Sequence, residues 1–419
     1  MIEAKKDAGV IVIGGGAAGM MAACVAARAG ADVLLFEKNE RLGKKLRITG
    51  KGRCNVTNDC DRGEFLANVA TNSKFLFAAI SRFSTTDTKE FFEELGVPLK
   101  VERGKRVFPV SDKAQDIVSA MERACRDSGV KIINQRVESI VTEGNRAVGV
   151  NAGKEQYRAK SVILCTGGAS YASTGSTGDG YRFAESVGHR IESIRPSLVP
   201  LVAKGRLCAH LQGLSLKNVA FKVRDGQSGK VVYEDFGELM FTHFGLTGPV
   251  VLSASAHLSD IESGRYVACI DMKPALDEKK LDERILSDFS EVKNRDFINS
   301  LDALLPQKMI SAVVGLSGID PRKKVNSITK EERERLVGVL KNIEIPLMGF
   351  RPINEAIITK GGVSVSEVSP KTMESRLVSG LYFAGEVLDL DAYTGGFNLQ
   401  IAFSTATLAG ENAAWASFE

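Results

Sequence analysis

A glycine-rich stretch near the N-terminus, VIVIGGGAAGMMAACVAARAGADVLLFEK at 10–38, constrains the fold more than any other feature of this chain. Its first four residues are apolar, and a helical pattern of small residues follows the glycines. A second apolar run then ends in Glu37. This order predicts a strand, a tight turn, a helix and a second strand, the start of an α/β fold with a parallel sheet.

The spacing of the glycines predicts a dinucleotide-binding turn. Gly14 allows a sharp turn, Gly16 lets the backbone approach a pyrophosphate, and Gly19 lets the helix pack closely on the strand. The first amide groups of that helix would point at the phosphates. Glu37 lies at the right distance along the chain to accept hydrogen bonds from a ribose. An acidic residue there disfavours a ribose phosphate, which favours FAD or NAD over NADP.

The composition is that of a globular protein of two or three domains, with 419 residues, 44% hydrophobic and 25% charged. The net charge of +4 is mild, so nucleic acid is not the expected partner. Seven cysteines without a Cys-x-x-Cys pair favour a reducing, cytoplasmic location. No apolar run reaches the ~20 residues of a membrane span. The histidines show no metal-ligand spacing, so we expect neither a membrane partner nor a metal site.

Three later segments favour FAD as the dinucleotide. A buried strand at 161–165 runs into the Thr-Gly-Gly turn at 166–168. Another strand, at 381–384, ends in Gly385 and Glu386, and an acidic residue there is well placed to hold a ribityl or pyrophosphate group. Two further glycines, at 395 and 396, lead into a helix. The N-terminus of that helix can face the pyrimidine edge of a flavin and stabilise its reduced, anionic form.

Together these motifs resemble the BaiN-like, or YhiN-type, NAD(P)/FAD-dependent oxidoreductases. The segments that carry the resemblance span nearly the whole chain: VIVIGGGAAG, GKGRCNVTN, TGGASY, STGDGY, LMFTHFGLTGP, ITKGGVSVSEVSPKTM and GLYFAGEVLDLDAYTGGFNLQIAFSTA. The resemblance implies a tightly bound FAD, a discontinuous Rossmann-like domain and an inserted domain. It also implies a relation to aminoacetone oxidase-like flavoproteins and, more distantly, to fumarate reductases. The His-Pro-Thr motif of the fumarate reductases is absent, so their chemistry is not carried over.

The expected cofactor-binding residues are drawn from these motifs and their surroundings. They are Gly14, Gly16, Ala17, Ala18, Gly19, Glu37, Lys38, Gly43, Arg47, Thr49, Gly50, Lys51, Gly52, Asn55, Val137, Thr166, Gly167, Gly168, Gly385, Glu386, Asp389, Gly396, Asn398, Leu399 and Gln400.

The loop RITGKGRCNVTN, at 47–58, follows the ribose-binding strand, and we expect it to lie against the flavin. Its glycines would let the backbone approach the ring system. Lys51 and Arg53, with Arg47 behind them, would favour the anionic reduced flavin or attract an anionic substrate. A solvated basic loop is the alternative, and for Arg47 the two interpretations are balanced. Cys54 is interpreted as a small residue packed beside FAD, because its spacing from Cys60 differs from that of flavin disulfide reductases.

The pattern changes between residues 195 and 346. Residues 195–271 alternate in strand fashion with hairpin signals, and residues 272–346 are mainly helical in periodicity with many charges. The sequence therefore predicts a discontinuous Rossmann-like FAD-binding domain at 1–194 and 347–419. The inserted domain, at 195–346, would be a β-rich substrate or cap domain that carries a small helical module. Such insertions commonly line the substrate pocket.

Three residues are candidates for catalysis, although the sequence assigns none. His243, in FTHFGLTGP, can donate a proton near the flavin, but a structural histidine that hydrogen-bonds the Gly-Pro turn is the favoured interpretation. Tyr171 can reach a substrate over the ring, and a packing role is equally consistent with its position. Lys51 is the third candidate, through its charge near the flavin.

We expect an FAD-dependent oxidoreductase that transfers hydride through flavin N5, reducing an unsaturated small molecule at the expense of a transiently bound NADH or NADPH. A flavin-dependent amine oxidase stays open, because the chain shows no second nucleotide-binding fingerprint. An RNA-modifying flavoprotein is less favoured, since basic stripes with interleaved aromatics are lacking. A redox sensor that uses Cys54 is a further alternative. The substrate and the oligomeric state are not determined by the sequence.

Overall fold

The computed structural model describes residues 7–261 and 264–418, and the chain divides into two compact units. The first unit comprises the residues up to Ser197 and those from Ile353 onward, and the second runs from Leu198 to Pro352. These borders lie slightly further along the chain than the 194/195 and 346/347 borders of the sequence analysis. Each unit has its own cluster of buried apolar side chains.

A seven-stranded sheet forms the centre of the first unit. Its parallel strands lie in the order β6 (Lys131–Ile133), β2 (Val33–Phe36), β1 (Asp7–Ile13) and β9 (Glu155–Leu164), and β18 (Leu381–Phe383) pairs with the end of β9. The antiparallel strands β8 (Arg146–Ala152) and β7 (Val137–Glu143) continue from the start of β9. In β2 every residue is buried, which is why its sequence is a continuous apolar run rather than an alternating one.

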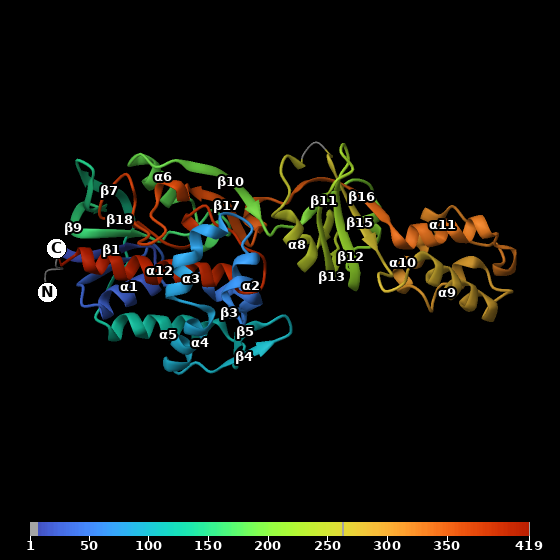
Figure 1. Ribbon diagram of the computed structural model, residues 1–419, viewed down its shortest axis with the longest axis horizontal. Coiled ribbons are helices and arrows are strands. Elements are labelled where there is room, and N and C mark those ends of the chain that lie inside the picture. The colour runs from blue at the N-terminus through green and yellow to red at the C-terminus, as the bar shows by residue number, and fades with distance from the viewer. Residues whose placement is uncertain (1–6, 262–263, 419) are drawn as a thin grey trace. The chain divides into compact units, whose positions relative to one another are not determined.

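Helices α1 (Ala17–Arg28) and α12 (Phe397–Ala416) pack against each other and against this sheet (Figure 1). Their close approach requires small residues, since a Cβ added at Gly410 would lie 2.6 Å from the Ala22 carbonyl oxygen. Helix α5 (Ala114–Asp127) packs beside α1 and contacts the 3₁₀ segment η1 (Leu46–Gly52).

Shorter elements complete the first unit. They are a small sheet of β3 (Thr57–Asn58), β5 (Arg106–Pro109) and β4 (Leu99–Glu102), the helices α2 (Arg62–Ala67), α3 (Phe77–Arg82), α4 (Thr85–Glu94) and α6 (Asp179–Ser186), and the antiparallel pair β10 (Ile191–Ser197) and β17 (Ile358–Val363).

The second unit is a closed barrel with a helical module. The barrel strands are, in spatial order, β11 (Leu201–Ala203), β14 (Gly245–Thr247), β13 (Val231–Phe241), β12 (Ser215–Asp225), β15 (Tyr266–Asp271) and β16 (Ile343–Phe350). The helices are α7 (Leu207–His210), α8 (Pro249–Ser255), α9 (Glu278–Glu291), α10 (Gln307–Ser317) and α11 (Lys330–Lys341). The sequence analysis ended the helical module at 346, but β16 begins at Ile343 and closes the barrel by pairing with both β15 and β11.

The predicted α/β class, with a Rossmann-type domain and a separate β-rich region, is confirmed. Among the residues that the structure describes, no helix combines the length and the apolar character needed to cross a membrane.

Candidate functional site

The carboxyl ends of the parallel strands bring together segments that are far apart in the sequence. The Gly14 amide donates to the Phe36 carbonyl oxygen at 2.8 Å, and the Cys165 amide donates to the Ile13 carbonyl oxygen at 2.9 Å. The Ala384 amide in turn donates to the Leu164 carbonyl oxygen at 3.1 Å. The loops after β1, β2, β9 and β18 therefore meet at one edge of the sheet, the edge at which open α/β sheets bind ligands.

The glycine turn after β1 has the geometry of a phosphate cradle. Gly14 has a φ of 102°, and a Cβ there would lie 2.6 Å from the Cys165 carbonyl oxygen. A Cβ at Gly19 would lie 1.7 Å from the Gly14 carbonyl oxygen, whereas a Cβ at Gly16 would meet no atom within 4 Å. Gly16 is also the N-cap of α1, and no side chain caps the helix. The amides of Ala17 and Ala18 thus begin a helix whose N-terminus is open to an anion, which fits the pyrophosphate of FAD.

Glu37 follows β2 and is 8% exposed. Its Oε2 accepts from the Gly15 amide at 2.8 Å, and its Oε1 accepts from the Asn39 amide at 2.8 Å and from Asn39 Nδ2 at 2.7 Å. The carboxylate therefore holds the cradle together in addition to being placed for a ribose, a structural role that the sequence analysis did not anticipate. Each carboxylate oxygen has more than one acceptor site, so these bonds do not prevent a hydroxyl from binding.

Lys38 joins this loop to the start of α6. Its Nζ donates to Thr177 Oγ1 at 2.7 Å and to Asp179 Oδ2 at 2.8 Å, and Arg136 and Arg182 also contact the Asp179 carboxylate. Burial by itself would raise the pKa of Asp179, but the hydrogen bonds from Lys38 and Arg182 outweigh it and hold that pKa well below its usual range. Val137 begins β7, next to Arg136, and is buried.

Both arginines of the 47–58 loop are paired with carboxylates. Arg47 donates to the Leu42 carbonyl oxygen at 3.4 Å and to Glu122 on α5 at 3.2 Å, and it lines a polar cavity of about 430 Å³. Arg53 donates to Asp112 at 2.7 Å, pairs with Glu102, and stacks over Phe108 with its Cζ 4.1 Å from the ring centroid. The expectation that both arginines stabilise a reduced flavin is thus not supported, because carboxylates on neighbouring elements take up their charge.

Lys51 is the cation of this loop that stays unengaged. It is exposed, and within the described part of the chain no polar partner is recorded for it. Its φ of 59°, with Gly50 at 56°, Gly52 at 84° and Cys54 at 60°, gives the loop a run of left-handed conformations. Thr49 closes the preceding turn through a 2.7 Å bond from its Oγ1 to the Leu46 carbonyl oxygen. Such strained backbone is concentrated at ligand-binding segments.

Two further groups around the cradle have unmet hydrogen-bonding capacity. Asn55 Oδ1 and Thr166 Oγ1 are both buried, and neither has a hydrogen-bond partner. Asn55 directly follows the left-handed run, and Thr166 begins the turn after β9. Orphaned buried polar atoms are uncommon in folded proteins, so their presence here fits a site that a polar ligand completes.

Cys54 lies in the same loop and is fully buried. Burial raises the pKa of its thiol to about 12 and, with the charge of Glu64, that of Cys60 to about 11. Both thiols are therefore protonated at neutral pH, whereas reactive cysteines are thiolates. This supports the packing role of Cys54 over a redox role.

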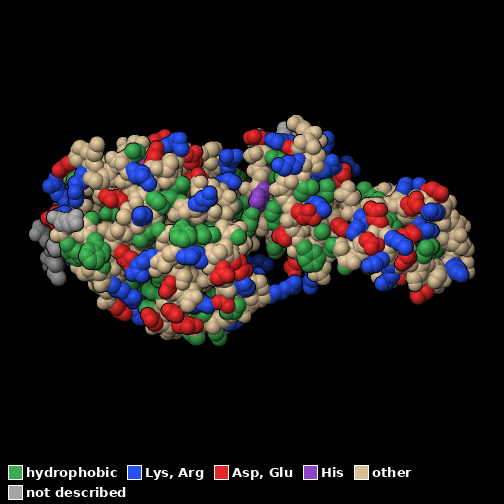
Figure 2. All heavy atoms as spheres, viewed as in Figure 1, with side chains coloured by type: hydrophobic (Ala, Val, Ile, Leu, Met, Phe, Trp, Pro, Cys, Tyr) green, Lys and Arg blue, Asp and Glu red, His purple; other side chains and the backbone are tan. Residues whose placement is uncertain are grey.

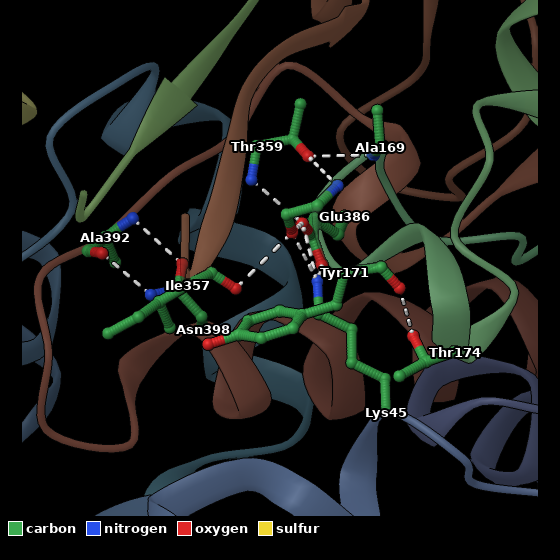
Figure 3. Close-up of polar contacts among 10 residues, drawn as sticks. Lys45, Ala169, Tyr171, Thr174, Ile357, Thr359, Glu386, Ala392 and Asn398 are labelled. Carbon is green, nitrogen blue, oxygen red and sulfur yellow. Dashed lines mark hydrogen bonds and ion pairs between the residues drawn. The ribbon is translucent and has the colours of Figure 1, made fainter. Parts of the chain in front are cut away.

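A network of polar contacts joins η1 to the loops after β9 and β18 (Figure 3). Lys45 Nζ donates to Glu386 Oε2 at 2.7 Å, to Glu386 Oε1 at 3.0 Å and to Ser170 Oγ at 2.8 Å. The Thr359 amide donates to Glu386 Oε1 at 2.9 Å, and Thr359 Oγ1 accepts from the Ser170 amide at 3.1 Å. A Cβ at Gly168 would lie 2.4 Å from Thr359 Oγ1, so the Thr-Gly-Gly turn packs directly on this network. Of these residues only Glu386 was predicted from the sequence; Lys45, Ser170 and Thr359 were not.

The glycines that flank the cradle on its other sides are also tightly packed. A Cβ at Gly385 would lie 2.8 Å from Ala18 Cβ, and one at Gly43 would lie 2.9 Å from Val118 Cγ1. Gly167, which has a φ of 71°, would place a Cβ 3.5 Å from Ser176 Oγ. Glycine at 385 thus lets the segment after β18 approach the first turn of α1, and glycine at 43 lets the loop after β2 approach α5.

The side chains selected at the start of α12 are occupied within the protein. Asn398 Nδ2 donates to the Ala392 carbonyl oxygen at 2.7 Å and its Oδ1 accepts from the Ala392 amide at 3.0 Å, which closes the preceding turn. Gln400 is fully buried and bonds to Thr57, Thr88, Ser404 and the Phe83 carbonyl oxygen. The side chains of Asn398 and Gln400 are therefore engaged within the protein. A cofactor would contact the backbone at the start of the helix, including that of Leu399.

Gly396 and Asp389 flank the same turn. Gly396 caps α12 with a φ of 98°, where a Cβ would lie 2.3 Å from the Thr57 carbonyl oxygen. Asp389 Oδ2 accepts from Asn72 Nδ2 at 2.9 Å, and burial raises the pKa of this carboxyl although the Asn72 bond opposes the shift.

His243 lies in the second unit, in the turn between β13 and β14, and is exposed. Thr242 Oγ1 closes this turn by bonding to the Gly245 carbonyl oxygen and amide at 3.0 and 3.1 Å. Thr242, rather than His243, therefore makes the side-chain hydrogen bonds that close the 242–245 turn, and a hydrogen bond from His243 to the Gly248–Pro249 turn stays a prediction. The ring of His243 lies 5.0 Å from that of Phe244. In the described ranges no group of three or more His, Cys, Asp or Glu side chains is arranged to hold a metal ion.

Comparison with known proteins gives matches along almost the whole chain. Residues 8–412 match the family model described as the HI0933-like protein Rossmann domain. The chain is 32% identical to a 3-dehydro-bile acid delta(4,6)-reductase of Clostridium scindens, over 96% of this chain and 98% of that protein. It is 31% identical to a ribosomal RNA dihydrouridine synthase of Haemophilus influenzae, over 94% of this chain and 96% of that protein.

A likeness at the level of the fold extends to a solved 3-ketosteroid-delta4-(5alpha)-dehydrogenase of Rhodococcus jostii. That chain is 17% identical, the match covers 99% of this chain and 98% of that one, and the TM-score is 0.52. At this identity the likeness concerns the fold alone.

Proposed function

The chain belongs to the HI0933-like Rossmann family and is an FAD-dependent oxidoreductase; from that premise we propose that it reduces a carbon–carbon double bond conjugated to a carbonyl group, using NADH or NADPH. The resemblance to BaiN-like flavoproteins that the motifs predicted is confirmed by the same matches.

The observation that carries the proposal is the chemistry shared by the two relatives. A 3-dehydro bile acid with double bonds at positions 4 and 6 is a conjugated ketone, and dihydrouridine is uridine whose double bond next to a carbonyl has been saturated. The names of both relatives therefore describe the reduction of a double bond conjugated to a carbonyl. Each relative is matched over more than nine-tenths of this chain. Because the two substrates are so different, we attribute the common reaction to the shared fold and cofactor, and we extend the reaction, but neither substrate, to this chain.

The cradle at the carboxyl edge of the sheet supports FAD as the cofactor. The uncapped N-terminus of α1, with open space at Gly16, would hold the pyrophosphate, and Glu37 would accept from the ribose. Glu386, fixed by Lys45, would orient the ribityl side, and the start of α12 would face the pyrimidine edge. When bound, FAD supplies hydride transfer through N5, with reduced nicotinamide as the source of the electrons.

A second candidate is the reduction of a uracil base in ribosomal RNA. It is favoured by one observation, the match to dihydrouridine synthases over 94% of this chain. The face of the molecule in Figure 2 intermixes acidic and basic side chains, and the net charge of +4 is mild. An RNA enzyme normally neutralises several phosphates with a basic stripe.

An anaerobic titration tests the central proposal. The purified protein is titrated with NADH and then NADPH while the visible absorbance of the flavin is followed, and the reduced protein is then mixed with conjugated ketones. We expect bleaching by one nicotinamide and recovery of the absorbance with an enone such as 4-androstene-3,17-dione or 2-cyclohexen-1-one. Recovery with a uracil-containing ribosomal RNA fragment, and not with enones, would select the second candidate. No bleaching, together with peroxide formation from small amines, would replace the proposal with amine oxidation.

A further inference from the structure

Tyr171 occupies a constrained position in the loop after β9. Its φ of 53° is left-handed, a conformation that a bulky residue rarely adopts without a reason. Two bonds to its carbonyl oxygen, from the Thr174 amide and from Thr174 Oγ1, both at 2.8 Å, lock the turn that follows. The residue before it, Ser170, is fully buried and fixed by Lys45 and by Thr359. The backbone of Tyr171 is therefore held from both sides.

The side chain of Tyr171 differs from those of Lys45, Ser170 and Glu386 in its hydrogen bonding. The three hydrogens of the Lys45 ammonium are matched by three acceptors, two on Glu386 and one on Ser170. The Tyr171 ring is partly buried, and among the described residues its hydroxyl has no recorded polar partner. In Figure 3 a dashed line joins the Tyr171 carbonyl oxygen to Thr174, and none reaches the phenol. The phenol is thus a free O–H donor of this loop, and, unlike the other unpartnered hydroxyl described above, that of Thr166, it is not fully buried.

We propose that Tyr171 is the catalytic proton donor, an inference that rests on the proposed reduction of a conjugated double bond. In that reaction the carbon β to the carbonyl receives the hydride, and the electron pair of the double bond moves to the α-carbon. The α-carbon then takes the proton of the Tyr171 hydroxyl, and water reprotonates the phenolate. The two electrons come from reduced nicotinamide by way of the flavin, so atoms and charges balance. A backbone held in place from both sides, with a side-chain O–H left unpaired, is what such a donor requires.

The remaining candidates fit this role less well. Lys45 has no free hydrogen, as its contacts show. Lys51 lies at the exposed apex of its loop and belongs to a side chain with four rotatable bonds. Tyr181 is 7% exposed, so its hydroxyl has little access to a substrate.

The test isolates the half-reaction that needs the proton. The flavin is reduced anaerobically with dithionite, which makes the experiment independent of nicotinamide, and is mixed in a stopped-flow instrument with 2-cyclohexen-1-one or 4-androstene-3,17-dione. In Tyr171→Phe we expect flavin reoxidation to slow by at least about 100-fold, whereas the FAD dissociation constant and the rate of reduction by NAD(P)H stay within about threefold. The matched control is Ser173→Ala, an exposed residue of the same turn, which should behave as wild type.

A second variant separates chemistry from folding. Tyr171→Gly removes the phenol and also relieves the left-handed backbone, which offsets part of the packing lost with the ring, so the variant should fold. Added phenol should restore part of its reoxidation rate, which a merely structural role would not produce. Reoxidation of Tyr171→Phe at the wild-type rate, or failure of phenol to rescue Tyr171→Gly, would overturn the assignment. A wild-type protein that no enone reoxidises would instead refute the proposed function, and this inference with it.

Discussion

At the scale of the residue, Glu37 serves both the fold and the expected cofactor. Glu37→Ala removes a buried charged acceptor, a loss of about 1.5–3 kcal/mol, so FAD affinity should fall by about 10- to 100-fold. It also frees the Gly15 amide and Asn39, so the apoprotein should lose stability as well. Titration of apoprotein with FAD, followed by the quenching of flavin fluorescence, measures the first effect.

The control for this prediction is Glu40→Ala, because Glu40 is exposed and its side chain pairs only weakly with Lys44 at 3.4 Å. An unchanged FAD dissociation constant in Glu37→Ala would remove Glu37 from the cofactor site.

His189 shows what burial does to a titratable residue. Its Nε2 lies 2.8 Å from Ser375 Oγ, its Nδ1 lies 3.2 Å from Glu367 Oε2, and its ring packs on Phe383. Burial lowers the pKa of His189, and the opposing effect of Glu367 is smaller. The unfolded chain, with a histidine pKa of about 6.5, therefore binds the proton more readily than the folded one. The stability that this residue contributes is present above about pH 6.5 and is lost as the pH falls below it.

We accordingly expect the free energy of unfolding to decrease between pH 7.5 and pH 5.5, and His189→Gln to flatten part of that decrease. Denaturant unfolding at both pH values measures it. The exposed His243→Gln should leave the slope unchanged, and a slope equally steep in His189→Gln would show that other groups cause it.

At the scale of the element, two glycines of the β1–α1 turn should respond differently to substitution by alanine. A Cβ at Gly16 meets open space, and the φ of −82° suits any residue, so Gly16→Ala should fold but lose FAD. A Cβ at Gly19 would lie 1.7 Å from the Gly14 carbonyl oxygen, so Gly19→Ala should destabilise the unit itself. Thermal unfolding and bound-flavin absorbance of the two variants distinguish these effects. Equal destabilisation in both would contradict an open space reserved for the phosphates.

The Lys45–Glu386 pair links η1 to the segment after β18 across the carboxyl edge of the sheet. Both side chains are about one-fifth exposed, at 22% and 21%. Removing one partner leaves the charge of the other unpaired in a partly buried site. Lys45→Met should therefore lower the free energy of unfolding by about 1–3 kcal/mol. The double variant Lys45→Met/Glu386→Gln should cost less than the sum of the single changes. Additive effects in denaturant unfolding would show that the pair is not coupled.

These elements also show what a sequence can and cannot reveal. The glycine turn, the strand that follows the helix and Glu37 at the end of that strand were predicted because their information lies within thirty residues of chain. Lys45 was missed because its partner Glu386 is 341 positions away, and nothing local marks the contact. The ion pairs of Arg47 and Arg53 were not predicted for the same reason: their carboxylates lie on α5 and on β4. The closure of the barrel by β16 depends on its pairing with β11, which no local pattern encodes.

At the scale of the whole molecule, the separate cores predict how the protein unfolds. The core of the first unit includes Phe403 and that of the second includes Phe221, and both side chains are fully buried. Every residue proposed to hold FAD belongs to the first unit. FAD at 100 times its dissociation constant increases the free energy of unfolding of the unit that binds it by about 2.7 kcal/mol. Calorimetry should therefore show two transitions, of which added FAD raises one by about 5–10 °C.

Core variants identify which transition is which. Phe403→Ala should lower the FAD-dependent transition and Phe221→Ala the other, each by about 3–5 kcal/mol of unfolding free energy. A single transition that both variants and FAD shift together would mean that the units unfold as one. The cofactor would then stabilise the barrel and its helical module as well as the cradle.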